Sequence, residues 1–132
     1  MSNTLDMLLK ADINKVKRPE KEVEITRLSE VVGEPVIFKM RALSPDEVDE
    51  IQEMAIDMKS GDIDVGKLRV HGVLYSVVEP DLKNKDLQKH FDSSSPKDLL
   101  KSMLLAGEID HLWSTSQELS GYGDKAVRKV KN

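Results

Sequence analysis

The stretch from Ser95 to Tyr122 constrains the fold more than any other, because it combines apolar residues at helical spacing with signals for helix ends. Ser95 is followed by Pro96 and, three positions on, by Asp98, a pattern that is typical of a helix N-terminus. The leucines and the methionine that follow recur three and four positions apart, which indicates one buried face. The stretch therefore predicts a helix over residues 96–105.

A second helix is expected to follow in the same stretch. Gly107 interrupts the apolar pattern, and because a glycine inside a helix costs about 1 kcal/mol relative to alanine, it is expected to be the joint between two helices. Glu108 then lies in the first turn of the second helix, over residues 107–119, where the helix dipole favours an acidic side chain. Gly121 is expected to end this helix in a left-handed conformation. Its predicted inward residues are Ile109, Leu112, Trp113 and Leu119.

Residues 21–43 change to a period of two, which indicates half-buried strands. Apolar and charged residues alternate twice, with Gly33 and Pro35 between the two runs, so an antiparallel hairpin is expected. A register in which paired residue numbers sum to 63 satisfies both faces, since opposite charges then face each other. The expected pairs are Ile25 with Phe38, Val23 with Met40, Glu24 with Lys39 and Glu22 with Arg41.

Three more helices are expected between the hairpin and the first stretch. Ser44 and Glu47 form a capping-box pattern with a proline between them, which predicts a helix over residues 45–59 with Met54 and Met58 on its apolar face. Residues 64–78 are ambiguous, because their valines favour a strand while their length favours a buried helix. The interpretation adopted is helix. A short helix is expected over residues 84–91.

The predicted fold class is α+β and mainly α, with an N-terminal antiparallel β-hairpin followed by a bundle of about five helices. A chain of 132 residues suits one domain, expected over residues 21–122. Residues 1–20 form an arm that is either a short helix docked on the body or on a partner, since Leu5, Leu8 and Leu9 share a helical face, or a frayed end. Residues 123–132 are expected to be a mobile basic tail.

Charge and composition exclude several classes of protein. Residues 124–132 carry four Lys or Arg and one Asp, net +3, which leaves −7 on residues 1–123 and −4 overall. A net acidic body argues against a dedicated nucleic-acid binder. The absence of cysteine excludes a disulfide framework and fits a reducing cytoplasm. Neither a membrane span nor a signal peptide is recognisable, so a cytoplasmic protein without a membrane partner is expected.

No catalytic, metal-binding or cofactor-binding pattern emerges, so the expectation is a non-catalytic binding protein with no cofactor. His71, His90 and His111 lack zinc-site spacing, and no nucleophile is paired with a base. The apolar faces fit either an ordinary core or an adaptable surface for an apolar helix, for which methionine is well suited. The candidate partner-binding residues are Met54, Met58, Leu100, Leu104, Leu105, Ile109, Leu112 and Trp113. Self-association is a further alternative that the sequence leaves open.

Several segments of the sequence resemble phage tail assembly chaperones of the XkdN-like family, from phages and prophages of Gram-positive bacteria. One segment runs from Leu104 to Ile109, with Leu112 and Glu118–Tyr122 after it, and another is Val77–Leu82, VVEPDL. A third comprises Phe38–Arg41 and Ser44–Glu47. The order and spacing of these segments carry the resemblance over roughly residues 20 to 122.

The resemblance implies a chaperone that binds the tape measure protein, and also the tail tube protein, before the tail tube polymerises. It implies action in the host bacterial cytoplasm and absence from the mature virion. An acidic protein with apolar grooves could cover the apolar stripes of a long helical client. The alternatives are a small helical adaptor or a DNA-binding regulator, although no predicted helix is basic along one face.

Overall fold

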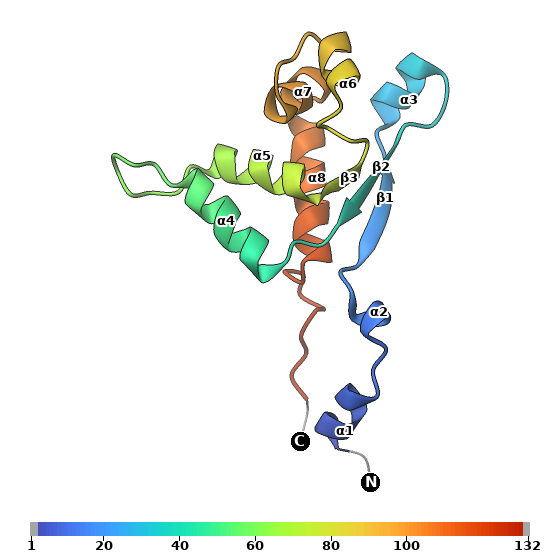
Figure 1. The fold of residues 1–132 in the computed structure, drawn as a ribbon, viewed down its shortest axis with the longest axis vertical. Helices are drawn as coiled ribbons and strands as arrows, with labels where there is room; N and C mark the ends of the chain where they lie inside the picture. The colour runs from blue at the N-terminus through green and yellow to red at the C-terminus, as the bar shows by residue number, and fades with distance from the viewer. Residues whose placement is uncertain (1–2, 131–132) are drawn as a thin grey trace.

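A three-stranded antiparallel sheet and a long central helix organise the fold (Figure 1). The computed structural model describes residues 3–130, so residues 1–2 of the expected arm and 131–132 of the expected tail lie outside the described part. Within residues 3–130 the chain forms eight helices and three strands. In chain order these are α1 (Thr4–Leu9), α2 (Ile13–Val16), β1 (Glu20–Glu24), α3 (Thr26–Val32), β2 (Ile37–Arg41), α4 (Pro45–Ala55), α5 (Val65–Ser76), β3 (Val77–Glu79), α6 (Lys85–His90), α7 (Pro96–Met103) and α8 (Ala106–Leu119).

The expected N-terminal hairpin is wrong in two respects, because the described chain forms a sheet of order β1-β2-β3 and a helix separates its first two strands. Helix α3 begins directly after Ile25 and ends at Gly33, whose φ of 87° lies in the left-handed region. Ser29 of α3 then holds the returning chain, since its hydroxyl accepts the Val36 amide proton at 2.8 Å. Gly33 does lie between the two strands, as expected, but the segment that connects them contains helix α3.

The strand register also differs from the expected one, because paired residue numbers sum to 61. Val23 pairs with Phe38, and Glu22 pairs with Lys39. The shift of two residues keeps Val23 and Phe38 on the inward face. The expected register required Ile25 to pair with Phe38, but the Ile25 amide donates to the Val36 carbonyl and the chain enters α3 at that point.

The third strand comes from the segment that was expected to be entirely helical over residues 64–78. Helix α5 ends at Ser76, and Val77–Glu79 pair antiparallel with β2. Two local effects favour this change, since β-branched valines fit a strand and the residue before Pro80 is pushed toward an extended backbone. The ambiguous segment therefore contains both a helix and a strand.

The expected bundle of about five helices is also wrong, because α1 and α2 lie in the arm and α3 lies inside the sheet connection. The helix expected over residues 45–59 ends at Ala55, and the chain turns back through an antiparallel bridge between Ile56 and Ile63. The joint between α7 and α8 lies at Leu104 and Leu105, whose backbones are extended. Gly107 lies in the first turn of α8 instead.

Helix α8 runs through the centre of the molecule, α5 crosses it, and α4 lies beside α5 (Figure 1). Arg69 of α5 forms an ion pair with Asp110 of α8 at 2.9 Å. Between α5 and α8, the buried hydroxyls of Ser76 and Ser116 share a hydrogen bond. The core lies where α5, α7 and α8 meet the inward face of the sheet, and it comprises Ile25, Phe38, Met40, Val70, Val73, Leu82, Leu99, Leu100, Met103, Leu104, Ile109 and Leu112.

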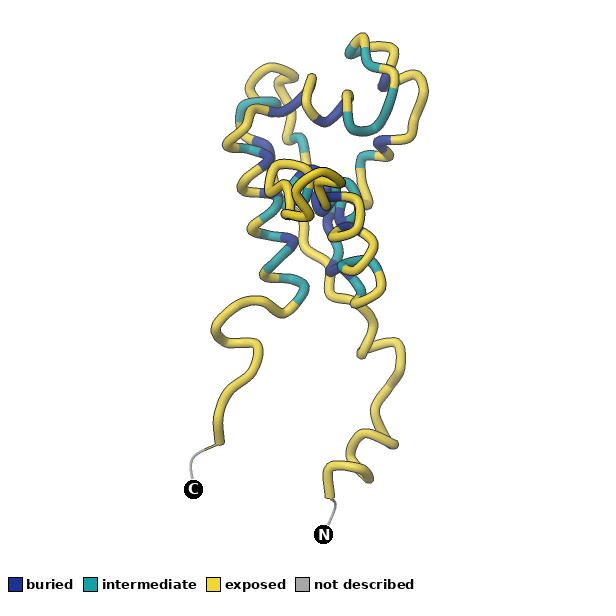
Figure 2. Tube along the Cα trace, turned by 90° about the vertical axis from the view of Figure 1, so that its left-hand side faces the viewer, coloured by how far each residue is buried: buried dark blue, intermediate teal, exposed yellow. Residues whose placement is uncertain are grey.

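The two ends of the described chain project from the same end of the body (Figures 1 and 2). Both segments are exposed along their length, whereas the buried residues gather in the helices and the sheet (Figure 2). Among the described residues, no helix combines the length and apolar character needed to cross a bilayer.

Candidate partner-binding surfaces

The candidate residues expected from the sequence divide into buried and exposed sets. Leu100, Leu104, Ile109 and Leu112 belong to the core and are at most 8% exposed, so a partner cannot reach them on the folded domain. Their helical spacing reflects packing of α7 and α8 against α5 and the sheet. Leu105, Met54 and Met58 are 56%, 45% and 94% exposed. These three are the expected residues that a partner can contact.

Trp113 is half-buried and packs against α5. A Cβ atom placed on Gly72 would lie 1.9 Å from Cζ3 of the indole, so α5 passes directly over the ring. Because the ring fills this close approach between two helices, its primary role is in packing.

Met54 and Met58 lie on a projecting segment, formed by the end of α4 and the turn into α5, that is here called the α4–α5 tip (residues 53–65). Backbone hydrogen bonds close the turn, since the Asp57 amide donates to the Asp62 carbonyl at 2.8 Å and the Asp64 amide donates to the Ala55 carbonyl at 2.7 Å. Gly61 supplies the left-handed position with φ of 77°. Asp64 also caps α5, where its carboxylate accepts the Lys67 amide at 3.1 Å. Together these hydrogen bonds fix the backbone conformation of the tip.

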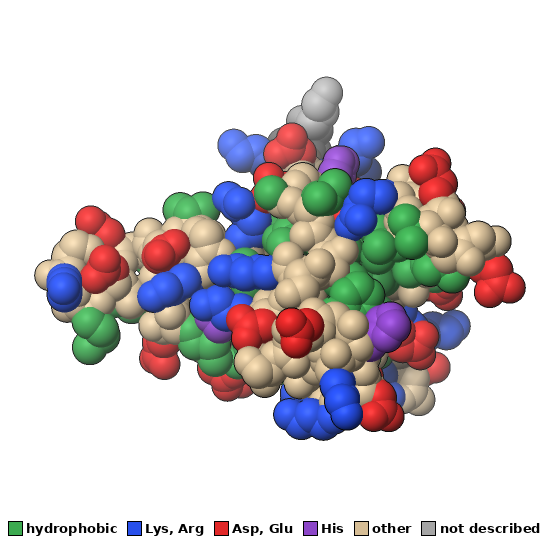
Figure 3. All heavy atoms as spheres, turned by 90° about the horizontal axis from the view of Figure 1, so that it is seen from above, with side chains coloured by type: hydrophobic (Ala, Val, Ile, Leu, Met, Phe, Trp, Pro, Cys, Tyr) green, Lys and Arg blue, Asp and Glu red, His purple; other side chains and the backbone are tan. Residues whose placement is uncertain are grey.

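The α4–α5 tip combines apolar side chains with negative charge. Seen from above, it extends from the body and carries apolar side chains beside acidic ones (Figure 3). Four acidic residues and one lysine give the tip a net charge of −3. Exposed apolar groups in this density are typical of an interaction site. The exposed apolar residues are Met54, Ile56, Met58, Ile63 and Val65.

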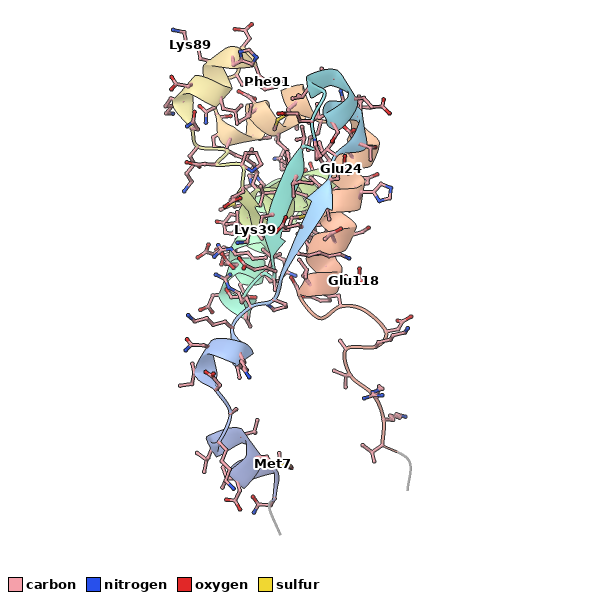
Figure 4. All side chains as sticks on the ribbon, turned by 90° about the vertical axis from the view of Figure 1, so that its right-hand side faces the viewer. Met7, Glu24, Lys39, Lys89, Phe91 and Glu118 are labelled. Atoms are coloured by element: carbon pink, nitrogen blue, oxygen red, sulfur yellow. The ribbon has the colours of Figure 1, made fainter. Side chains whose placement is uncertain are left out.

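The N-terminal arm (residues 3–19) carries a second set of exposed apolar side chains. Met7 on α1 lies well away from the sheet and from α8 (Figure 4). Asn3 and Asp12 cap the arm's short helices through their side chains, at 2.9 Å in each case. The helices therefore form from local signals, without packing on the body. The exposed apolar residues are Leu5, Met7, Leu8, Leu9, Ile13 and Val16.

A third, smaller apolar area lies at the end of α3, where Val31 and Val32 are exposed. Arg27 fixes this helix to α8, because its guanidinium donates to both carboxylate oxygens of Glu108, at 2.8 and 3.1 Å. A further bond at 2.8 Å reaches the Met103 carbonyl. The hydrogen bond from Arg27 lowers the pKa of Glu108, so the pair stays ionised at neutral pH. The α3 end is thus held rigidly beside α7 and α8.

No group of three His, Asp or Glu side chains in residues 3–130 has the geometry to hold a metal ion. Burial, together with nearby lysines, lowers the pKa of His71 and keeps its imidazole neutral at neutral pH. A hollow of about 590 Å³ beside α6 and α7 is lined by lysines, serines and aspartates, including Lys89 and Asp98. The notable surface features are the exposed apolar groups.

Sequence reasoning missed part of this surface. Ile56, Ile63 and Val65 complete the α4–α5 tip, but the expected helix ran through Ile56, and the other two were not assigned to a surface. The apolar residues of the arm are expected either to dock on the body or on a partner or to fray, but they are not among the candidate partner-binding residues. Their signal was a short apolar helix followed by polar and basic residues without an apolar partner nearby in the chain.

Comparison with known proteins supports the family resemblance seen in the sequence. The sequence model of the family described as "Phage XkdN-like tail assembly chaperone protein, TAC" matches residues 5–132. None of the curated proteins compared with the chain matches it. The crystal structure of the protein YqbN, a structural genomics target, is similar in fold, with a TM-score of 0.68, 21% sequence identity, and coverage of 93% of this chain and 98% of that one. At this identity the similarity concerns the fold alone.

Proposed function

The chain belongs to the phage XkdN-like tail assembly chaperone family, and we propose that it is a non-catalytic chaperone that binds the tape measure protein and keeps it soluble during tail tube assembly. The tail tube protein is the second expected partner. In this proposal the protein acts in the cytoplasm of the host bacterium. It leaves before the virion is complete.

The observation that carries this proposal is the α4–α5 tip, where apolar side chains are exposed on a closed turn. Met58 is almost fully exposed, and burying such a side chain against a partner contributes about 1.5–3 kcal/mol. Methionine also adapts its shape to different partners at low cost, which suits a client with many similar apolar stripes. The tip therefore offers a contact for the apolar face of an amphipathic helix.

Charge supports the same function. Residues 20–123 carry 21 acidic and 12 basic residues, net −9, so the body of the protein is strongly acidic. Mutual repulsion between acidic bodies keeps complexes apart and in solution. A client whose apolar stripes are covered by such bodies would stay soluble at concentrations where it aggregates alone.

Co-expression with the tape measure protein from the same genome tests the proposal. The expected result is a soluble client that co-purifies with the chaperone. Met58→Asp should weaken the complex while leaving the melting temperature unchanged, because the side chain makes little contact with the fold. Ser60→Asp is the matched control, since it adds the same charge to the same turn without removing an apolar group.

Two results would contradict the proposal. The first is a client that is equally soluble with and without this protein. The second is a purified pair that does not associate at micromolar concentrations. If Met58→Asp and Ser60→Asp weaken the complex equally, the effect comes from the added charge. The apolar side chain of Met58 would then not be part of the client-binding site.

A further inference from the structure

We propose that the N-terminal arm of one copy of this protein binds the α4–α5 tip of a second copy. The arm is a basic segment with exposed apolar groups, and the tip is an acidic turn with exposed apolar groups. The proposal concerns the protein without its client, so it does not rest on the proposed function.

The arm is attached to the body only at its base. Arg18 forms an ion pair with Glu47 at the start of α4 and donates to the Ala42 carbonyl at 3.3 Å. Beyond this anchor, the hydrogen bonds formed by residues 3–16 within the described chain are local to the arm. Six apolar side chains are therefore held on a segment that the body leaves uncovered.

Charge identifies the partner of this segment. Residues 1–17, beyond the Arg18 anchor, carry three Lys and two Asp, net +1, whereas the tip carries −3. Lys10 and Lys15 are interleaved with the leucines, isoleucine and valine of the arm. On the tip, Glu53 and Asp62 lie among the methionines and isoleucines. Contact between the two would bury apolar groups on both sides and place opposite charges together, which favours both affinity and fast association.

A second copy is the partner that the geometry indicates. In the structure the arm extends away from its own tip, which projects from another side of the body (Figure 1). Since the arm and the tip are different surfaces, each copy can use both at once. Such head-to-tail contacts form open chains, or rings if the rotation closes. The protein is therefore expected to form a series of oligomers of increasing size.

The C-terminal tail is the competing basic segment. Residues 124–132 carry net +3, but their apolar residues are Ala126, Val127 and Val130, and no helix forms in the described residues 120–130. The arm offers three times as many large apolar groups, six against Val127 and Val130, on two short helices. The tail therefore serves as the control for binding by charge alone.

Sedimentation velocity across micromolar to submillimolar concentrations tests the proposal with full-length variants. The wild type should form larger species as its concentration rises. Leu8→Gln with Leu9→Gln should remove this growth by disabling the arm, and Met58→Asp should remove it by disabling the tip. Val127→Gln with Val130→Gln, which removes two apolar groups from the tail, should assemble like the wild type.

Mixing provides the decisive measurement. The arm variant retains a working tip and the tip variant retains a working arm, so their mixture should form a dimer of one copy of each and nothing larger. A charge exchange gives a second check. Replacing Lys10 and Lys15 with Glu should weaken assembly about tenfold, and a partner with Glu53→Lys and Asp62→Lys should restore it.

Three results would overturn the proposal. One is a wild type that stays monomeric over the whole range, as it would if the arm bound its own tip. Another is an arm variant that assembles like the wild type. The last is a mixture that yields no dimer. Because none of these experiments contains the tape measure protein, each of these results would leave the proposed function standing.

Discussion

Gly72→Ala should destabilise the protein through a collision with Trp113. A Cβ atom at this position would lie 1.9 Å from Cζ3 and 2.5 Å from Cε3 of the indole, closer than any relaxed contact between carbons. Either the ring or helix α5 must move. Overpacking of this kind costs about 1–3 kcal/mol, and the better helix propensity of alanine offsets up to about 1 kcal/mol. We expect a net loss of about 1–2 kcal/mol.

The assay is urea and thermal unfolding followed by tryptophan fluorescence, because Trp113 is the one tryptophan in the sequence. The expected fall in melting temperature is about 4–10 °C for a domain of this size. Gly107→Ala is the matched control. A Cβ atom there meets nothing within 4 Å, and the residue lies in the first turn of α8. This control should therefore be neutral or slightly stabilising.

A double-mutant cycle separates the collision from other effects of the substitution. In a Trp113→Leu background, followed by circular dichroism, Gly72→Ala should cost little, because the indole is gone. If Gly72→Ala is as stable as the wild type, or costs the same in both backgrounds, the close approach of α5 to the ring is not what requires glycine.

Three further predictions concern other contacts. Glu108→Gln should lower the melting temperature near neutral pH and reduce its fall on acidification, because the hydrogen bond from Arg27 lowers the pKa of Glu108 from its ordinary value and the pair's contribution is lost as pH falls through that lowered pKa. An unchanged pH profile would contradict this. Ser116→Ala should cost about 1–3 kcal/mol in urea unfolding by leaving the Ser76 hydroxyl without this partner, and adding Ser76→Ala should cost less than the two single changes together. Deleting residues 124–132 should leave the melting temperature nearly unchanged, whereas a fall of several degrees would mean that the tail packs on the body.

Helix ends are where the sequence predicts the structure best, because capping is local chemistry. The Ser44 and Ser95 side chains accept the Glu47 and Asp98 amides, at 3.2 and 3.1 Å, as their patterns predict. Gly121 follows α8 in the left-handed conformation with φ of 91°. Each of these signals needs only three or four neighbouring residues to act.

Strand register depends on structure formed elsewhere in the chain, and the sequence is compatible with more than one register. Glu20, Glu22 and Glu24 repeat with the same period as the strand, so a slip of two residues still places a glutamate opposite Lys39. The position of α3 decides between the registers, since it fixes where the chain leaves β1. Helix α3 itself has no side-chain N-cap and only seven residues, so it gave a weak local signal.

Whether an apolar residue faces the core or a partner is the part that the sequence could not decide. Leu104 and Leu105 are neighbours of the same type, yet they are 5% and 56% exposed. The difference arises because the two residues form the extended joint between α7 and α8, and in extended backbone successive side chains point in opposite directions. The same ambiguity applies to the arm, whose leucines resemble those of a core helix.

Strand β1 lies at an edge of the sheet, and this position limits how the protein can meet an unfolded chain. An edge strand presents free amide and carbonyl groups that can template the addition of another strand, which is the first step of much aggregation. Four of the five residues of β1 are charged, and Glu20, Lys21, Glu22 and Glu24 are all exposed. Such charges discourage strand addition. The charges on β1 thereby keep this edge from recruiting another strand, and contact is directed to the helical and turn surfaces of the protein.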